Sequence, residues 1–139
     1  MSAAGTEQVG PGRYRVALRF SDIDELGHVN QAVYHELLEE ARTQMLFALP
    51  VPPGGSYVMA RVELNHRREV RLQHRYVEVA LQIEAVGRSS ITMAQQIFRA
   101  DGELAADGRA VVVAWDGEQR GSRPLTGPET AALRALPAS

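Results

Sequence analysis

The feature that most constrains the fold is one helical pattern in a sequence that otherwise alternates in steps of two. Between residues 31 and 48, apolar side chains recur at intervals of three and four, which places them on one face of an α-helix. These side chains are Tyr34, Leu37, Leu38, Ala41, Met45 and Ala48. Asn30 is suited to cap the helix, and the prolines in residues 50–53 must end it. A helix of this kind must bury its apolar face against another part of the chain.

The rest of the sequence supplies a sheet to cover that face. Apolar and polar residues alternate in residues 13–20, before the helix, and four further strand patterns follow in residues 57–116. Gly-Arg-Ser-Ser at 87–90 and three Asp-Gly pairs mark tight turns between the later strands. A second short helix is expected in residues 127–136, with a proline in its first turn. The pattern favours an α+β fold in which a five-stranded antiparallel sheet packs on one long helix.

The domain organisation is expected to be simple. A chain of 139 residues fits one domain, which we assign to residues 13–139. Residues 1–12 are small, polar and contain glycine and proline, and we interpret them as a flexible N-terminal arm without the pattern of a signal peptide. Because a single sheet leaves edges and a solvent face, we expect pairing with further copies, as a homodimer or homotetramer.

Charge and composition exclude several classes of function. The net charge of −2 lacks the excess of Lys and Arg that nucleic acids or membrane surfaces require. No apolar run approaches the length of a membrane span. The absence of cysteine excludes disulfides, thiolate metal sites and a cysteine nucleophile. We expect a cytoplasmic protein that binds neither nucleic acid nor membrane.

The stretch just before the long helix carries the candidate chemistry. Asp22 and Asp24 share a face of an extended segment, and Gly27 permits a sharp turn. His28 and Asn30 follow, at the start of the helix, where the first amides lack internal partners. Such amides can polarise a carbonyl or hold an oxyanion, and a nearby carboxylate can act as general base or nucleophile. Together, these groups suit acyl transfer to water.

Each of these residues also has an ordinary structural interpretation. Either aspartate could close the turn, Asn30 could only cap the helix, and His28 could be a polar loop residue. Glu39 could bond within a site, but Glu39 and Arg42 are also spaced as an ordinary i,i+3 pair on a helix. It is the density of polar groups in one turn that favours a site.

The segment D-I-D-E-L-G-H-V-N-Q-A-V-Y resembles the active-site segment of the hotdog-fold acyl-CoA thioesterases, the 4-hydroxybenzoyl-CoA thioesterase-like family. Residues 87–116 are similar to the closing hairpins of that family in turn spacing. The resemblance implies a hotdog fold, a long central helix wrapped by the sheet, and an acyl-CoA thioesterase active in fatty acid metabolism. An enzyme of this family would need no cofactor.

The resemblance also implies roles for individual residues. Asp24 matches the catalytic carboxylate of the family, whereas Asp22 is expected to be structural. Gly27 and Tyr34 match a glycine and a helix tyrosine of its substrate site, and the amides around Gln31 would polarise the thioester carbonyl.

His-Val-Asn-Gln is similar to the H-V-N-N segment of plant-type acyl-carrier-protein thioesterases, which implies polar, catalytic roles for His28 and Asn30. Leu26 stands where that pattern has an asparagine, so the triad of the plant-type enzymes is incomplete. Glu39 is a further candidate for binding substrate.

The coenzyme A phosphates need cationic or hydroxyl groups, and two places could provide them. Arg88, Ser89 and Ser90 occupy a hairpin where the family often binds the nucleotide, and Arg67 is a further cation. Solvated loop arginines are the ordinary alternative. The four histidines show no metal-ligand spacing, so no metal is expected.

The sequence therefore predicts hydrolysis of an acyl-CoA or acyl-carrier-protein thioester to free acid and thiol. Two other functions stay open on the same fold. One is a module that binds acyl-CoA without turnover, and the other is a dehydratase or hydratase. The acyl group itself is not defined by the sequence.

Overall fold

The computed structural model of the chain describes residues 5–136. In chain order the elements are β1 (Thr6–Gly10), β2 (Arg13–Ala17), the short 3-10 helix η1 (Phe20–Asp22), α1 (Gln31–Phe47), β3 (Gly55–His66), the 3-10 helix η2 (Leu72–His74), β4 (Tyr76–Val86), β5 (Ser90–Arg99), β6 (Leu104–Asp116), β7 (Gly121–Ser122) and α2 (Gly127–Arg134). Within this range, no helix is both long and apolar enough to cross a membrane.

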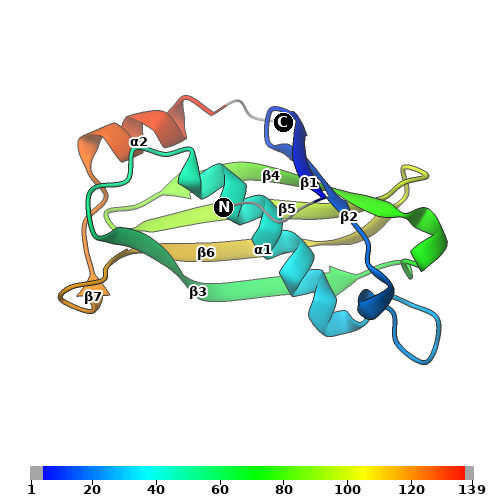
Figure 1. The fold of residues 1–139 in the computed structure, drawn as a ribbon. Helices are drawn as coiled ribbons and strands as arrows, with labels where there is room; N and C mark the ends of the chain where they lie inside the picture. The colour runs from blue at the N-terminus through cyan, green and yellow to red at the C-terminus, as the bar shows by residue number, and fades with distance from the viewer. Residues whose placement is uncertain (1–4, 137–139) are drawn as a thin grey trace.

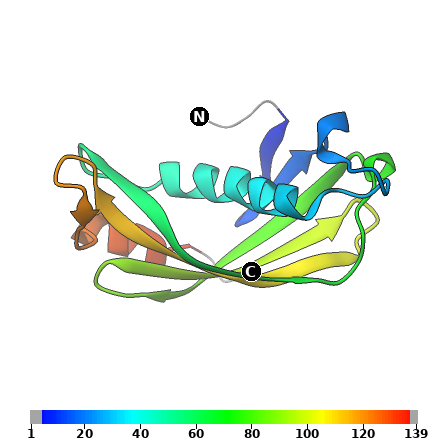
Figure 2. The ribbon, with the colours of Figure 1, turned by 90° about the horizontal axis from the view of Figure 1, so that it is seen from below.

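One antiparallel sheet curves around the long helix α1 (Figures 1 and 2). Its strands lie in the order β1-β2-β4-β5-β6-β3, and β7 pairs with β6. In the described part of the chain, β1 and β3 are therefore the outer strands. This arrangement confirms the predicted α+β hotdog fold, with the central helix enclosed by the sheet.

The core forms between α1 and the concave face of the sheet. Leu38 and Ala41 on α1 are fully buried, as the three- and four-residue spacing predicted. They belong to one cluster with alternate residues of β4 and β5, which are Val77, Val79, Leu81, Ile91, Met93 and Ile97. Burial of each large apolar side chain contributes about 1.5–3 kcal/mol, so the contact between α1 and the sheet fixes the helix and the loop before it.

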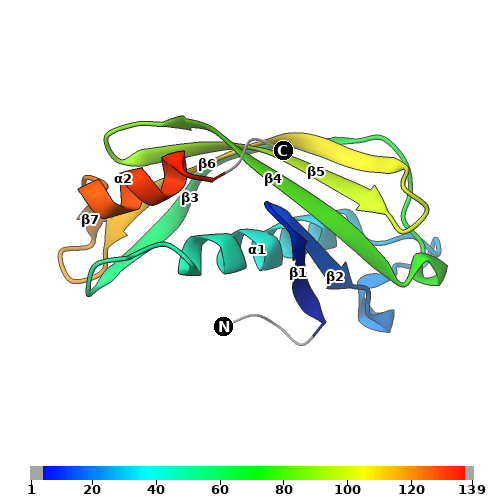
Figure 3. The same ribbon diagram turned by 90° about the horizontal axis from the view of Figure 1, so that it is seen from above.

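The predicted second helix is confirmed as α2, which lies near the β4–β5 turn (Figure 3). Just before α2, the Leu125 amide donates to the Arg88 carbonyl of that turn at 2.8 Å. Thr126 caps it, accepting from the Glu129 amide at 3.1 Å, and Oε1 of Glu129 accepts from the Thr126 amide at 2.9 Å. The buried Glu129 carboxylate also pairs with Arg123, Nη1 to Oε1 at 2.7 Å, and accepts from the Tyr57 hydroxyl. These three residues, Tyr57, Arg123 and Glu129, connect α2 to β3, and we call them the α2 latch.

Over the described residues the sheet has seven strands instead of the predicted five, and the first extra strand lies in the predicted flexible arm. Residues 6–10 form β1, which pairs with β2 from Thr6↔Val16 to Gly10↔Arg13. Gly12, at φ +66, makes the turn between them. The free backbone edge of β2 accepts another strand whatever its side chains, which explains why a polar segment is ordered here. Residues 1–4 of the arm, and residues 137–139, lie outside the described residues.

Candidate active site

The predicted site lies in the loop of residues 23–30, which leads into the N-terminus of α1. Ile23 and Val29 form an isolated antiparallel bridge, so the loop is a small hairpin. Gly27 adopts φ +81 at its tip, a conformation that favours glycine. The Val29 amide donates to the Val70 carbonyl at 2.7 Å, which ties the loop to the segment after β3. The structure therefore brings Asp24, Gly27, His28 and Asn30 together at one end of the sheet.

Asp24 is half-buried, and one of its carboxylate oxygens holds the loop in shape. Oδ1 accepts from the amide of Leu26 at 2.9 Å and from the amide of His28 at 3.3 Å. Oδ2 has no partner among residues 5–136. The carboxylate is thus oriented by one oxygen and has the other available to water or a ligand.

Asp22, by contrast, is buried and fully engaged within the chain. Its Oδ2 accepts from the Arg19 amide at 2.7 Å, and its Oδ1 accepts from the Arg19 guanidinium, Nη2 at 2.7 Å and Nε at 3.1 Å. The carbonyl of Asp22 accepts from the Asn30 amide at 2.9 Å. Asp22 therefore shapes the base of the loop. Counting partners among residues 5–136, only Asp24 of the two aspartates has a carboxylate oxygen that remains free.

At the helix start, one backbone amide lacks a partner within residues 5–136. The Asn30 side chain accepts from the Ala32 amide at 2.9 Å, and the Asn30 carbonyl accepts from the Val33 amide at 2.9 Å. The Gln31 amide has no partner within the described residues. Because it lies at the positive end of the helix dipole, it is the strongest candidate to bind a carbonyl oxygen or an oxyanion.

His28 has an acidic partner that the sequence did not reveal. Its Nε2 contacts the carboxylate of Glu69, and Oε1 of Glu69 accepts from Arg71 Nε at 2.7 Å. Glu69 lies 41 positions further along the chain than His28 and stands in no motif, so only the folded loop contacts bring it to the site. A carboxylate at Nε2 fixes the orientation of the imidazole.

Tyr34 lies in the core beneath the loop and is only 4% exposed. Its ring meets the His66 ring edge-on, with centroids 4.7 Å apart. Burial raises the pKa of the Tyr34 phenol, and a hydrogen bond with the Val70 backbone opposes this. In this position, Tyr34 supports the loop from below.

A cleft of about 490 Å³ runs along α1, between that helix and β3. Its walls are His35, Glu36, Glu39, Arg42, Thr43 and Leu46 on α1, Tyr57, Met59 and Val62 on β3, and Val112 on β6. Glu39 is exposed at its mouth. The volume is within the range of small-molecule sites, about 300–1,000 Å³, and the cleft begins one turn after the free Gln31 amide.

The residues predicted to bind coenzyme A occupy opposite ends of the sheet. Arg67 follows β3 at the end that holds the site loop, where its amide bonds Ala105. Arg88 and Ser89 lie in the β4–β5 turn and Ser90 begins β5; the carbonyl of Ser89 accepts from the Ala114 amide. The ten residues of β5 separate the two ends, about 33 Å in an extended strand. One ligand cannot contact both groups in a single copy of the chain.

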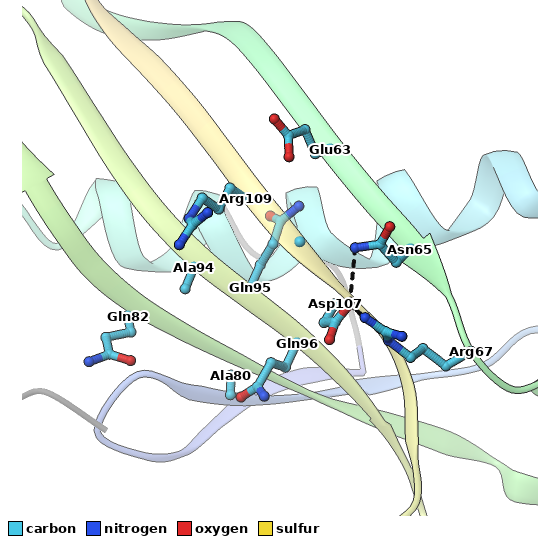
Figure 4. Close-up of a pocket in the computed structure, with 11 residues that line it drawn as sticks. Glu63, Asn65, Arg67, Ala80, Gln82, Ala94, Gln95, Gln96, Asp107 and Arg109 are labelled. Atoms are coloured by element: carbon cyan, nitrogen blue, oxygen red, sulfur yellow. Dashed lines mark hydrogen bonds and ion pairs between the residues drawn. The ribbon is translucent and has the colours of Figure 1, made fainter.

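Arg67 also borders a polar pocket of about 330 Å³ on the sheet face turned away from α1 (Figure 4). There its Nε donates to Asp107 Oδ1 at 3.1 Å, and Asn65 donates to the same oxygen at 3.3 Å. Arg67 is therefore already paired. No group of three or more Asp, Glu or His side chains that could hold a metal occurs among the described residues.

The comparisons with known proteins agree with this geometry. The family model of the thioesterase-like superfamily matches residues 18–136, and the chain belongs to that superfamily. This confirms the predicted recognition and class of enzyme, a hotdog-fold thioesterase. A comparison with curated proteins gave no match.

Solved structures with the same fold include several thioesterases. A thioesterase from Thermus thermophilus, complexed with coenzyme A and Zn, is 36% identical, with 90% of this chain and 98% of that chain covered and a TM-score of 0.79. A probable thioesterase from Escherichia coli is 23% identical over 89% and 97% of the two chains, with a TM-score of 0.73. A DHNA-CoA thioesterase from Staphylococcus aureus is 17% identical over 89% and 88%, with a TM-score of 0.77.

Proposed function

We propose that this protein hydrolyses acyl thioesters of coenzyme A, or of acyl carrier protein, to the free acid and the thiol. One observation carries the proposal. A single loop presents the carboxylate of Asp24 just before a helix start with the amide of Gln31, and within the described residues one Asp24 oxygen and this amide have no partner. The coenzyme A bound to the Thermus thermophilus thioesterase supports this class of substrate.

The chemistry uses these two groups in turn. Asp24 Oδ2 takes a proton from water, and the oxygen of that water attacks the thioester carbon. The carbonyl oxygen gains the negative charge, and the Gln31 amide stabilises it. The carbon–sulfur bond then breaks, and the leaving thiolate takes up the proton that Asp24 removed from water, which regenerates the carboxylate. In the alternative route, Asp24 attacks the carbon itself, and water hydrolyses the resulting anhydride.

The remaining predicted residues support that reaction. The Glu69 carboxylate orients the His28 ring at the edge of the loop, and Asn30 shapes the helix start by occupying the two neighbouring amides. The acyl chain lies in the cleft between α1 and β3, where Glu39 stands at the mouth. We infer that the protein works in the cytoplasm, in fatty acid metabolism, as a homo-oligomer.

The replacement Asp24→Asn tests the proposal. The variant keeps the side-chain oxygen that accepts from the Leu26 amide, so the loop should fold. Loss of the basic carboxylate should lower kcat/KM for an acyl-CoA by about 100- to 10,000-fold. Thiol release, measured with short- and long-chain acyl-CoA, gives the rate. Turnover close to that of the unaltered protein would contradict the assigned role of Asp24.

Asp22→Asn is the matched control. It should lower the melting temperature, because buried bonds to Arg19 are weakened, while the folded protein keeps most of its activity. Tight binding of acyl-CoA by the unaltered protein, without any thiol release, would instead favour the binding module.

A further inference from the structure

Arg42 is a buried cation that has no acidic partner in the described part of the chain. Its side chain lies beneath α1 and is only 6% exposed. Among residues 5–136 it makes one hydrogen bond, from Nη1 to Gln95 Oε1 at 2.9 Å, and no ion pair. Glu39, one turn earlier, affects it through charge alone. A guanidinium has five N–H donors, so most of the donors of Arg42 have no partner among the described residues.

Gln95 holds the guanidinium from the sheet side and adds a second unpaired donor. Because a guanidinium can only donate, the amide oxygen of Gln95 must face it. The Gln95 amide nitrogen is then buried without a hydrogen bond in the described part of the chain. A buried donor without a partner costs about 1–3 kcal/mol. Gln95 therefore fixes the position of Arg42 at a cost in stability.

Arg42 lines the cleft between α1 and β3, with apolar Leu46, Met59 and Val112 among its neighbours there. In the empty cleft, water can bond to its remaining donors. An acyl chain expels that water, and a plain hydrocarbon offers no acceptor in its place. The cleft therefore favours a chain with an oxygen at the level of Arg42.

The charges around Arg42 favour a neutral acceptor. Glu36 and Glu39 line the same cleft. A carboxylate on the acyl chain would meet this negative charge, whereas a carbonyl oxygen accepts from the guanidinium without that repulsion. Burial also lowers the pKa of Arg42, opposed by the charge of Glu39.

We propose that Arg42 determines acyl specificity, selecting chains that carry a carbonyl oxygen over hydrocarbon chains of equal length. The inference rests on the proposed thioesterase function and names its substrate class as oxo-acyl thioesters. Arg42 lies eleven positions after Gln31 on α1, about 16 Å along a helix. The oxygen recognised by Arg42 is thus far along the chain from the reacting thioester.

The test is a comparison of matched substrates. Saturated acyl-CoA thioesters are compared with analogues in which a ketone replaces successive methylenes beyond the third carbon. At one position, the ketone should raise kcat/KM by at least about 10-fold, as a hydrogen bond to a charged group allows. The measured ratio is kcat/KM for the ketone divided by kcat/KM for the saturated thioester. In Arg42→Met, a replacement of similar length, this ratio should fall close to one. Arg42→Lys should keep part of it.

Arg134→Met is the control, because Arg134 is exposed on α2, and it should leave the ratio unchanged. Two outcomes would overturn the inference. The first is that the unaltered protein shows no ketone preference at any position, a result that does not depend on whether Arg42→Met folds. The second is an unchanged ratio in Arg42→Met. If Arg42→Met and Glu39→Gln are then both monomers by light scattering, Arg42 instead neutralises Glu39 of a second copy.

A binding measurement separates this inference from the proposed hydrolysis. Non-hydrolysable thioether analogues of coenzyme A, with and without the ketone, are titrated by calorimetry. Tighter binding of the ketone by the unaltered protein, lost in Arg42→Met, would support the role of Arg42 even if no thioester were cleaved. Equal binding of the two analogues, with normal hydrolysis, would contradict the role of Arg42 alone.

Discussion

At the start of α1, Asn30 satisfies two amides with its own side chain and carbonyl, and this leaves the Gln31 amide for a ligand. The replacement Gln31→Pro removes that single donor. Proline is well tolerated as the first residue of a helix, and the extended backbone of Asn30, at φ −61 and ψ 141, suits a residue before proline. If the amide holds the oxyanion, kcat should fall by about 100- to 1,000-fold, with a smaller change in KM.

The control for this prediction is Gln31→Ala, which removes the side chain and keeps the amide. It should retain most of kcat. Equal losses in the alanine and proline variants would assign the effect to the Gln31 side chain and not to the amide. Circular dichroism checks that α1 still forms in both variants.

At the scale of elements, the α2 latch makes stability depend on pH. Burial opposes ionisation of Glu129, but hydrogen bonds from Arg123, the Thr126 amide and Tyr57 outweigh it and lower the pKa to about 2. In the unfolded chain a glutamate has a pKa of about 4.3. Because the folded value is lower, the stabilisation is complete above the unfolded pKa and is lost as the pH falls toward 2.

The replacement Glu129→Gln tests the latch. Unfolding by urea at pH values between 2 and 6 should show a stability that falls with acid in the unaltered protein. The variant should be less stable at neutral pH and should lose less stability on acidification. Parallel curves for the two proteins would show that Glu129 does not cause the acid dependence.

Helices and strands could be predicted from the sequence where the spacing of apolar side chains determines them. The spacing in α1, with Leu38 and Ala41 on the inner face, placed the helix within one residue of its observed end. β1 could not be predicted, because backbone bonds to β2 order it and its side chains carry no pattern. The i,i+3 spacing of Glu39 and Arg42 suggested an ion pair on the helix surface. In the structure, the Arg42 side chain instead turns inward and donates to Gln95. Such tertiary contacts, like that of His28 with Glu69, join residues far apart in the sequence.

At the scale of the whole molecule, β3 is an outer strand of twelve residues with apolar side chains near its edge. Met59 and Val62 are 41% and 38% exposed. No strand in residues 5–136 pairs with this edge, and an edge of this length favours pairing with a second copy. We expect Met59→Lys to weaken the oligomer and shift the mass measured by light scattering toward that of one chain.

Val9→Lys is the matched control, because Val9 is equally exposed, at 41%, on the other outer strand, β1. It should leave the mass unchanged. A shift toward the mass of one chain in Val9→Lys, but not in Met59→Lys, would place the contact between copies at β1.

Pairing of two copies through β3 would bring together the ends of the sheet that carry Arg67 and Arg88. Two copies joined antiparallel along β3 would lie head to tail, so the turn with Arg88, Ser89 and Ser90 of one copy would lie at the same end as Asp24 and Arg67 of the other. The adenine end and the acyl end of one coenzyme A thioester would then be held by different chains. Each pair would contain two shared sites, and two inactive variants with defects at opposite ends could restore one intact site when mixed.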